Sequence, residues 1–143
     1  MTKELIEKAT EFCDRHKYRF TDPRKHVLEI IGKSSKALGA YDILEQLSAV
    51  IKAPNPPTVY RAIEFWQTHG FIHRIESLNA YTACGAGHRH KGSHFLICDD
   101  CGDVTEAHLC DFPQSLKETT DKRAFTPDRW NFEIHGTCDS CNG

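Results

Sequence analysis

Apolar residues recur with a helical period along the first part of the chain. From residue 3 to residue 16, apolar side chains fall on one helical face and charged side chains fall elsewhere, which predicts an amphipathic helix. The apolar positions are Leu5, Ile6, Ala9, Phe12 and Cys13. Cys13 belongs to this stripe, so we expect it to be a small buried residue.

Two more helices are predicted before the proline-rich stretch 53–57. Thr21 is placed to cap the second helix, Pro23 fits its first turn, and Gly32 is expected to end it. The third helix is expected from about residue 40 to residue 51. The inward positions are Val27, Leu28, Ile30 and Ile31 in the second helix, and Ile43, Leu44, Leu47 and Val50 in the third.

A fourth helix and a hairpin follow the prolines. Thr58 is expected to be the N-cap of this helix, and Gly70 is expected to end it. Its core stripe is Val59, Ala62, Ile63 and Trp66, which leaves Tyr60, Arg61 and Glu64 on the other face. Residues 71–76 and 80–83 then alternate between apolar and polar around residues 77–79, a pattern typical of a β-hairpin.

Short helices followed by a two-stranded hairpin predict a winged-helix domain that binds DNA. The last helix of such a domain enters the major groove. Arg61 can donate to guanine O6 and N7, and Tyr60 can contact a thymine methyl. Basic residues near the second helix are expected to contact phosphates or the minor groove. The candidate DNA-contacting residues are Lys17, Arg19, Arg24, Tyr41, Thr58, Tyr60 and Arg61.

The last 60 residues predict a small α+β module. Residues 94–98, 103–107 and 130–135 are expected to be strands, and a helix is expected from Pro113 to about Lys122. A module with these few elements has exposed sheet edges and only a small core. Dimerisation and metal binding are therefore expected to stabilise it. The predicted fold class is therefore α+β, with a winged-helix DNA-binding domain at 1–83, a metal-binding dimerisation domain at 84–143 and a hinge at about 82–90.

Two Cys-x-x-Cys pairs predict a structural zinc site. Cys98 and Cys101 form the first pair, and Cys138 and Cys141 form the second. Two matched pairs supply the four thiolates of a closed tetrahedral site, which has no open position for chemistry. A redox pair and two disulfides are the alternatives. A redox pair needs no second pair. Disulfides require an oxidising compartment, and the sequence shows no secretory signal that would direct the protein to one.

Other metal-binding side chains surround the first pair. They are Cys84, His88, His90, His94, Glu106 and His108. Their mixed sulfur, nitrogen and oxygen donors suit a second zinc site that is weaker than an all-cysteine one. The residues alone leave open which of the histidines binds.

Charge and hydropathy limit the classes of function. The net charge is −2, but residues 1–83 carry 12 Lys and Arg against 10 Asp and Glu, whereas residues 84–143 carry 6 against 10. This small excess proves no nucleic-acid partner by itself. No long apolar run and no leader segment is evident, so we expect a cytoplasmic protein with no membrane contact.

Five motifs follow one another along nearly the whole chain. They are Arg19-x-Thr21-x-x-Arg24, Pro57-Thr58-Val59-Tyr60-Arg61, Gly70-Phe71-Ile72, Leu96-Ile97-Cys98-x-x-Cys101-Gly102 with histidines ahead of it, and Glu133-Ile134-His135-Gly136-x-Cys138-x-x-Cys141. In these motifs and their order the chain resembles the ferric uptake regulator family. The chain most resembles the zinc uptake regulator branch, through Ala40-Tyr41-Asp42-Ile43-Leu44, Phe71-Ile72-His73-Arg74-Ile75-Glu76 and the position of Cys84. It lacks the dense histidine run that is usual in the iron branch.

The resemblance implies a homodimeric repressor that binds operator DNA when loaded with zinc and controls zinc-uptake genes. It also implies a regulatory zinc at the hinge, in addition to the structural one in each subunit. Carried over by motif, the regulatory ligands are His73, Cys84, His90 and Glu106. The spacing ahead of Cys98 is shifted, so His88 or His94 is the alternative to His90. An ion held by both domains would fix the angle between them, and with it the spacing of the two recognition helices.

Three alternatives remain. The first keeps the fold but senses iron, manganese or peroxide, although a cysteine ligand favours zinc over those harder ions. The second is a zinc hydrolase that uses Glu106 as base, but no HExxH spacing occurs and the winged helix would have no role. The third is a metal carrier whose winged helix binds proteins. We expect no enzymatic activity and no small organic substrate.

Overall fold

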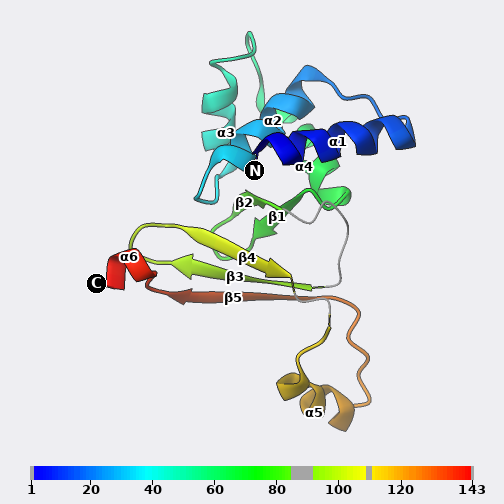
Figure 1. Cartoon of the computed structure of the whole chain (residues 1–143), viewed down its shortest axis with the longest axis vertical. Coiled ribbons are helices and arrows are strands. Elements are labelled where there is room, and N and C mark those ends of the chain that lie inside the picture. Colours follow the sequence, from blue (N-terminus) through cyan, green and yellow to red (C-terminus); the bar gives the residue numbers. More distant parts are fainter. Residues whose placement is uncertain (1, 85–91, 109–110, 143) are drawn as a thin grey trace. The chain divides into compact units, whose positions relative to one another are not determined.

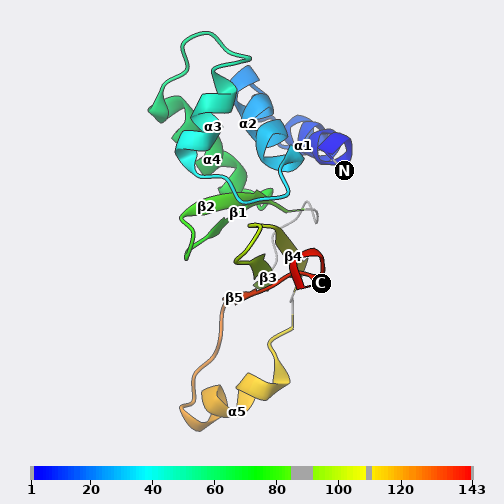
Figure 2. The same ribbon diagram turned by 90° about the vertical axis from the view of Figure 1, so that its left-hand side faces the viewer.

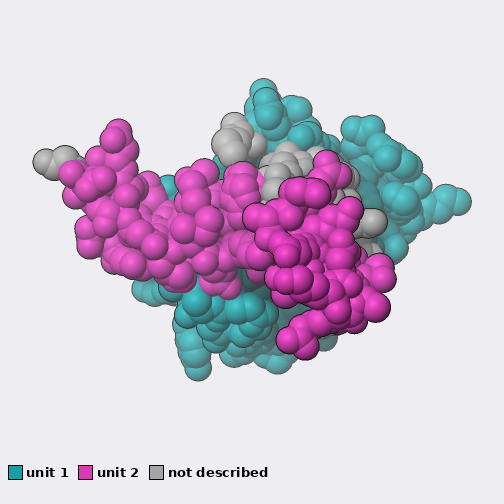
Figure 3. All heavy atoms as spheres, turned by 90° about the horizontal axis from the view of Figure 1, so that it is seen from below, with its two compact units in different colours: residues 1–89 teal, residues 90–143 magenta. Residues whose placement is uncertain are grey.

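The chain divides into two compact units, residues 1–89 and residues 90–143 (Figure 3). The computed structural model describes residues 2–84, 92–108 and 111–142. The first unit contains α1 (Thr2–His16), α2 (Asp22–Lys33), α3 (Ala40–Leu47), α4 (Pro56–Thr68), β1 (Ile72–Ile75) and β2 (Ala80–Ala83) (Figure 1). The second contains β3 (Gly92–Cys98), β4 (Val104–His108), α5 (Gln114–Lys122), β5 (Trp130–Gly136) and α6 (Asp139–Asn142).

The core of the first unit lies among its four helices and the hairpin (Figure 2). Trp66 on α4 is fully buried. Its ring meets Phe20 at 5.7 Å and Phe71 at 5.2 Å between centroids, in edge-to-face arrangements that favour aromatic pairs. Cys13 is buried in the same core, as predicted, and burial raises the pKa of its thiol.

The start of α2 is as predicted, but its end is not. The hydroxyl oxygen of Thr21 accepts from the backbone N–H of Arg24 at 3.4 Å, which caps the helix. Gly32 does not end α2, because the helix continues to Lys33. A Cβ at position 32 would lie 2.9 Å from the Leu5 side chain, so this glycine lets α1 approach α2 closely.

The third helix is shorter than predicted. It ends at Leu47, with Ser48 as its C-cap. Val50 was expected to face the core but is 56% exposed, because it follows the last helical turn. Ile43 and Leu47 are fully buried, as predicted.

The fourth helix begins earlier than predicted. Its N-cap is Asn55, whose side-chain oxygen accepts from the backbone N–H of Thr58 at 3.0 Å. Pro56 and Pro57 occupy the first turn, where a missing N–H costs nothing because no intrahelical partner exists for it. Thr58 therefore lies inside the first turn and is not the cap.

Gly70 directs the chain from α4 into the hairpin, as predicted. It has φ of 82°, and the N–H of Phe71 donates to the carbonyl oxygen of Trp66 at 2.9 Å. Left-handed backbone of this kind favours glycine. β1 and β2 then pair antiparallel, with His73 opposite Thr82, and complete the predicted winged helix.

The second unit is built on a three-stranded sheet in the order β4-β3-β5. β3 pairs antiparallel with β4 and parallel with β5. Because β3 and β5 run parallel, their last residues lie side by side at one end of the sheet, where Cys98 is opposite Gly136. The two Cys-x-x-Cys pairs follow these strand ends, so the topology places them together.

The helix α5 buries no side chain. The Phe112 ring, just before it, meets the Trp130 ring of β5 at 5.0 Å. None of the described helices is long and apolar enough to cross a membrane.

Candidate metal centre and nucleic-acid interface

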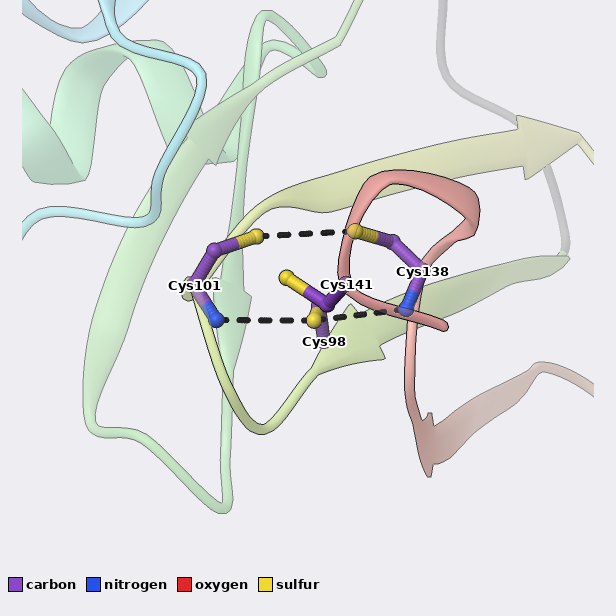
Figure 4. Close-up of side chains that lie close together, drawn as sticks. All are labelled: Cys98, Cys101, Cys138 and Cys141. Carbon is purple, nitrogen blue, oxygen red and sulfur yellow. Dashed lines mark hydrogen bonds between the residues drawn. The ribbon is translucent and has the colours of Figure 1, made fainter. Parts of the chain in front are cut away.

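The four cysteines of the two pairs converge on one point (Figure 4). All four sulfur atoms lie within 4.8 Å of one another, and the Sγ atoms of Cys101 and Cys138 are 3.7 Å apart. A tetrahedral zinc ion with Zn–S bonds of about 2.3 Å requires sulfur atoms about 3.8 Å apart. The arrangement of these thiols therefore fits a closed four-cysteine zinc site.

Backbone amides favour the thiolate form of one of these sulfurs. The N–H groups of Cys101 and Cys138 point at Sγ of Cys98, at 3.5 Å and 3.3 Å. They lower the pKa of the Cys98 thiol to about 6, because hydrogen bonds to sulfur favour the charged form. The side chain of Cys138 raises the pKa of Cys141 to about 12, since neighbouring sulfurs do not ionise together without a cation.

A contact between a histidine and a carboxylate lies beside the cysteines. Nδ1 of His135 is 3.1 Å from a carboxylate oxygen of Asp99, and the N–H of Asp99 donates to the carbonyl oxygen of Gly136 at 2.8 Å. These contacts join the loop after β3 to the end of β5. Both side chains are more than one-third exposed, so the contact itself adds little stability.

Two of the predicted regulatory ligands lie together in the first unit. His73 is on β1, and Cys84 follows β2 and is fully buried. The N–H of Cys84 donates to the carbonyl oxygen of Phe71 at 2.8 Å, which extends the hairpin by one bond. Ligand atoms of His73 and Cys84 lie within 4.8 Å of each other, a separation suited to a shared ion.

The third, Glu106, lies on β4 in the second unit, opposite Phe95. Ser93 approaches its carboxylate, with Oγ 3.5 Å from Oε2. His94 is adjacent to Phe95 on β3, so strand alternation places it on the opposite sheet face from Glu106. His94 and Glu106 therefore do not face a common ion. His88 and His90, and the side chain of His108, lie outside the described residues.

A hollow in the first unit brings together most of the predicted DNA-contacting side chains. It lies between the loop after α1 and the start of α4. Its lining is Lys17, Tyr18, Arg19, Thr21, Pro23, Arg24, Thr58, Arg61 and Ala62. Lys17, Arg19 and Arg61 are exposed, so their charges are available to a polyanion.

Arg24 differs from the other cations of the hollow, because it is half-buried and engaged within the protein. Its guanidinium carbon lies 3.7 Å from the centroid of the Phe65 ring. The same group donates to the carbonyl oxygen of Arg19 at 2.6 Å.

The two predicted tyrosines line a separate apolar cleft between α3 and α4. Tyr41 is 83% exposed and Tyr60 is 52% exposed. The other lining residues are Ala40, Leu44, Pro56 and Val59. Two exposed rings beside an apolar cleft are suited to contact with thymine methyl groups or sugars.

Two residues of the interface were not singled out in the sequence. Asn55 caps α4 and so determines where the helix begins. It thereby fixes how far Tyr60 and Arg61 lie from the N-terminal end of the helix. An asparagine directly before a proline pair is a recognisable cap signal. Phe65, which supports Arg24, gave no such signal, because the contact joins α2 to α4.

A winged-helix unit with a basic hollow, followed by a unit with a four-thiol centre, defines a class of metal-binding transcription regulators. The chain belongs to the ferric uptake regulator family, whose profile matches residues 15–135. This confirms the family resemblance predicted from the motifs.

Comparison with individual relatives points to one branch of the family. The chain is 34% identical over 142 residues to the zinc uptake regulation protein of Escherichia coli (strain K12), covering 98% of this chain and 82% of that protein. It is 29% identical over 123 residues to the ferric uptake regulation protein of Staphylococcus epidermidis, covering 86% of each. A solved zinc uptake regulator complexed with zinc and DNA has a TM-score of 0.89 at 33% identity, covering 99% of this chain and 95% of that chain.

Proposed function

We propose that this chain is a zinc-responsive transcriptional repressor that binds operator DNA as a zinc-loaded homodimer and controls zinc-uptake genes. Its similarity over nearly the full chain to a zinc uptake regulator solved with zinc and DNA carries this conclusion. Sensing of iron, manganese or peroxide by the same fold has less support, because the ferric relative is less similar.

The DNA-binding surface is formed by α4 and the basic hollow. Tyr60 and Arg61 project from α4 into solvent, as a recognition helix in the major groove requires. Lys17 and Arg19 supply phosphate contacts on one side of that helix. Thr58 and Tyr41 complete the contact set.

Zinc occupies two kinds of site in each subunit. The structural zinc is held by Cys98, Cys101, Cys138 and Cys141, whose spacing fits it. The regulatory zinc is held by His73, Cys84, His90 and Glu106, with His88 as the alternative to His90. A bound zinc supplies only coordination here, since a regulator of this class performs no reaction.

The hinge lies at about residues 82–90, between the DNA-binding domain and the dimerisation domain. The sequence predicts these domains at 1–83 and 84–143, whereas the compact units are residues 1–89 and 90–143, so Cys84 belongs to the first unit. Ligands drawn from both domains hold one interdomain angle. That angle sets the distance between the two recognition helices of a dimer, so only the metal-loaded form matches the half-site spacing of an operator.

The second unit has an apolar sheet face suited to pairing with another copy of the chain. Leu96 on β3 is 48% exposed, and its parallel neighbour Ile134 on β5 is 53% exposed. Phe125, just after α5, is 64% exposed. Exposed apolar side chains on one small unit are typical of an interaction surface. We place the dimer in the cytoplasm, where a repressor meets the chromosome.

A DNA-binding titration tests the function. The probe is a duplex selected from a random-sequence pool by the zinc-loaded protein, compared with a scrambled duplex of equal length. Binding to the selected duplex is measured with zinc, ferrous iron, manganese or a chelator. Zinc should give the tightest binding, and the chelator should release the DNA. Equal affinity under all four conditions would contradict a metal-dependent repressor.

A further inference from the structure

Arg24 is held by contacts from two parts of the first unit. Its NH1 group donates to the carbonyl oxygen of Arg19 at 2.6 Å. Its guanidinium stacks on the Phe65 ring, with 3.7 Å between the guanidinium carbon and the ring centroid. Its own carbonyl oxygen accepts from Nε1 of Trp66 at 2.8 Å. Arg24 thus connects the loop after α1 to the recognition helix α4.

The loop that Arg24 holds carries exposed charges of the DNA-binding surface. Lys17 and Arg19 both lie in this loop. Tyr18, between them, meets the Phe65 ring edge-on at 5.5 Å. Phe65 therefore supports the loop through both Tyr18 and Arg24.

The shape of the Arg24 side chain matters here more than its charge. A planar guanidinium can lie flat on an aromatic ring and still donate in its own plane to a carbonyl oxygen. A lysine ammonium keeps the charge, but it has no plane with which to make both contacts in this geometry.

We propose that Arg24 is a positioning residue that fixes the loop carrying Lys17 and Arg19 against α4. It thereby sets the spacing between those two cations and Arg61 across the hollow. Lys17 and Arg19 can then contact phosphates at the same time as Arg61 contacts a base. This inference rests on the proposed DNA-binding function and assigns Arg24 a role other than direct phosphate binding.

Charge-preserving and charge-removing variants separate the two roles. Arg24→Lys, Arg24→Gln and a control at the far end of α2, Lys33→Gln, are titrated as zinc-loaded proteins with the selected and scrambled duplexes at several salt concentrations. We expect Arg24→Lys and Arg24→Gln each to lose about tenfold in affinity for the selected duplex, on the scale of a lost hydrogen bond to a charged group. The ratio of specific to non-specific affinity should fall in both, and Lys33→Gln should leave it unchanged.

A direct phosphate contact gives a different result. Arg24→Lys would then bind like the wild type, while Arg24→Gln would weaken both duplexes equally and reduce the salt slope by about one. That outcome overturns the inference while the proposed function stands. A wild type without preference for the selected duplex overturns both.

The position of Trp66 gives a readout without DNA. The chain has two tryptophans, so the indole N–H signal of Trp130 is an internal reference in an NMR spectrum. Arg24→Lys should shift the Trp66 signal and leave that of Trp130 in place. A double-mutant cycle with Arg19→Ala should show non-additive losses, because Arg24 acts through the loop. An unshifted Trp66 signal together with additive losses contradicts the proposal.

Discussion

The backbone N–H of Tyr18 donates to the carbonyl oxygen of Cys13 at 2.9 Å and closes the C-terminal end of α1. This bond requires left-handed backbone at the residue between the helix and Tyr18. That residue is Lys17, with φ of 60°. Glycine usually occupies such a position, so the chain accepts backbone strain to place a cation beside the recognition helix.

Stability and DNA binding should therefore change in opposite directions on substitution of Lys17. Lys17→Gly relieves the left-handed strain and should raise the free energy of unfolding by up to about 1 kcal/mol. The same change removes one exposed charge and should reduce the salt slope of DNA binding by about one. Thermal unfolding and salt titration measure the two effects. Lys17→Ala is the matched control, since it loses the charge and keeps the strain. Lower stability of the glycine variant would contradict this account.

Arg61 should determine sequence preference. Arg61→Ala should cost about 1–3 kcal/mol in binding to the selected duplex and relax the preference at one base pair. Competition binding against single-base variants of the duplex measures both. Gln67→Ala, at an exposed position near the other end of α4, should bind like the wild type. A loss that is equal for every sequence would instead make Arg61 a phosphate contact.

Removal of one thiol from the four-cysteine centre should unfold the second unit more easily. Cys138→Ser leaves three sulfur ligands and should lower the tightly held zinc by one ion per chain, measured by elemental analysis. Because structural zinc contributes directly to folding, the melting temperature should fall as well. Cys13→Ala, a change in the core of the first unit, should keep the full zinc content while losing stability. Retention of tight zinc by Cys138→Ser would exclude the four-thiol assignment.

Loss of a regulatory ligand should weaken the binding of exchangeable zinc and leave the binding of structural zinc unchanged. His73→Ala and Glu106→Gln should each lower the affinity for this zinc by at least about tenfold, since the loss of even an outer partner of a ligand has that effect. DNA binding should then need more zinc, while the tightly held ion remains. His94→Ala is the matched control, because His94 lies on the other sheet face from Glu106. Calorimetric zinc titrations distinguish these variants. Equal zinc affinity in the wild type and Glu106→Gln would remove Glu106 from the site.

Periodicity and cap chemistry were sufficient to predict most of the elements. The stripe from Val59 to Trp66 is buried, and Tyr60 and Arg61 are exposed, as the helical period requires. The errors lie at helix ends and in the short helix α6, which was not predicted. Prolines at 56 and 57 were interpreted as a break before α4, although a helix accepts proline in its first turn.

Contacts between distant residues could not be predicted in the same way. The Cys-x-x-Cys spacing indicated which thiols belong together, but the parallel pairing of β3 with β5 that unites them leaves no local signal. The stacking of Arg24 on Phe65 also leaves no local signal, because the sequence around each residue shows only an ordinary helix. Such contacts depend on how the helices pack and not on local propensity.

The parallel pairing of β3 with β5 also has a consequence for synthesis. Cys101 and Cys138 are 37 positions apart, and α5 lies in the loop between them. A growing chain exposes Cys98 and Cys101 to the cell before the last strand of the sheet, β5, leaves the ribosome. Metal loading at this centre therefore waits until β5 and the second cysteine pair have been synthesised, and until then Cys98 and Cys101 depend on a reducing environment for protection from oxidation.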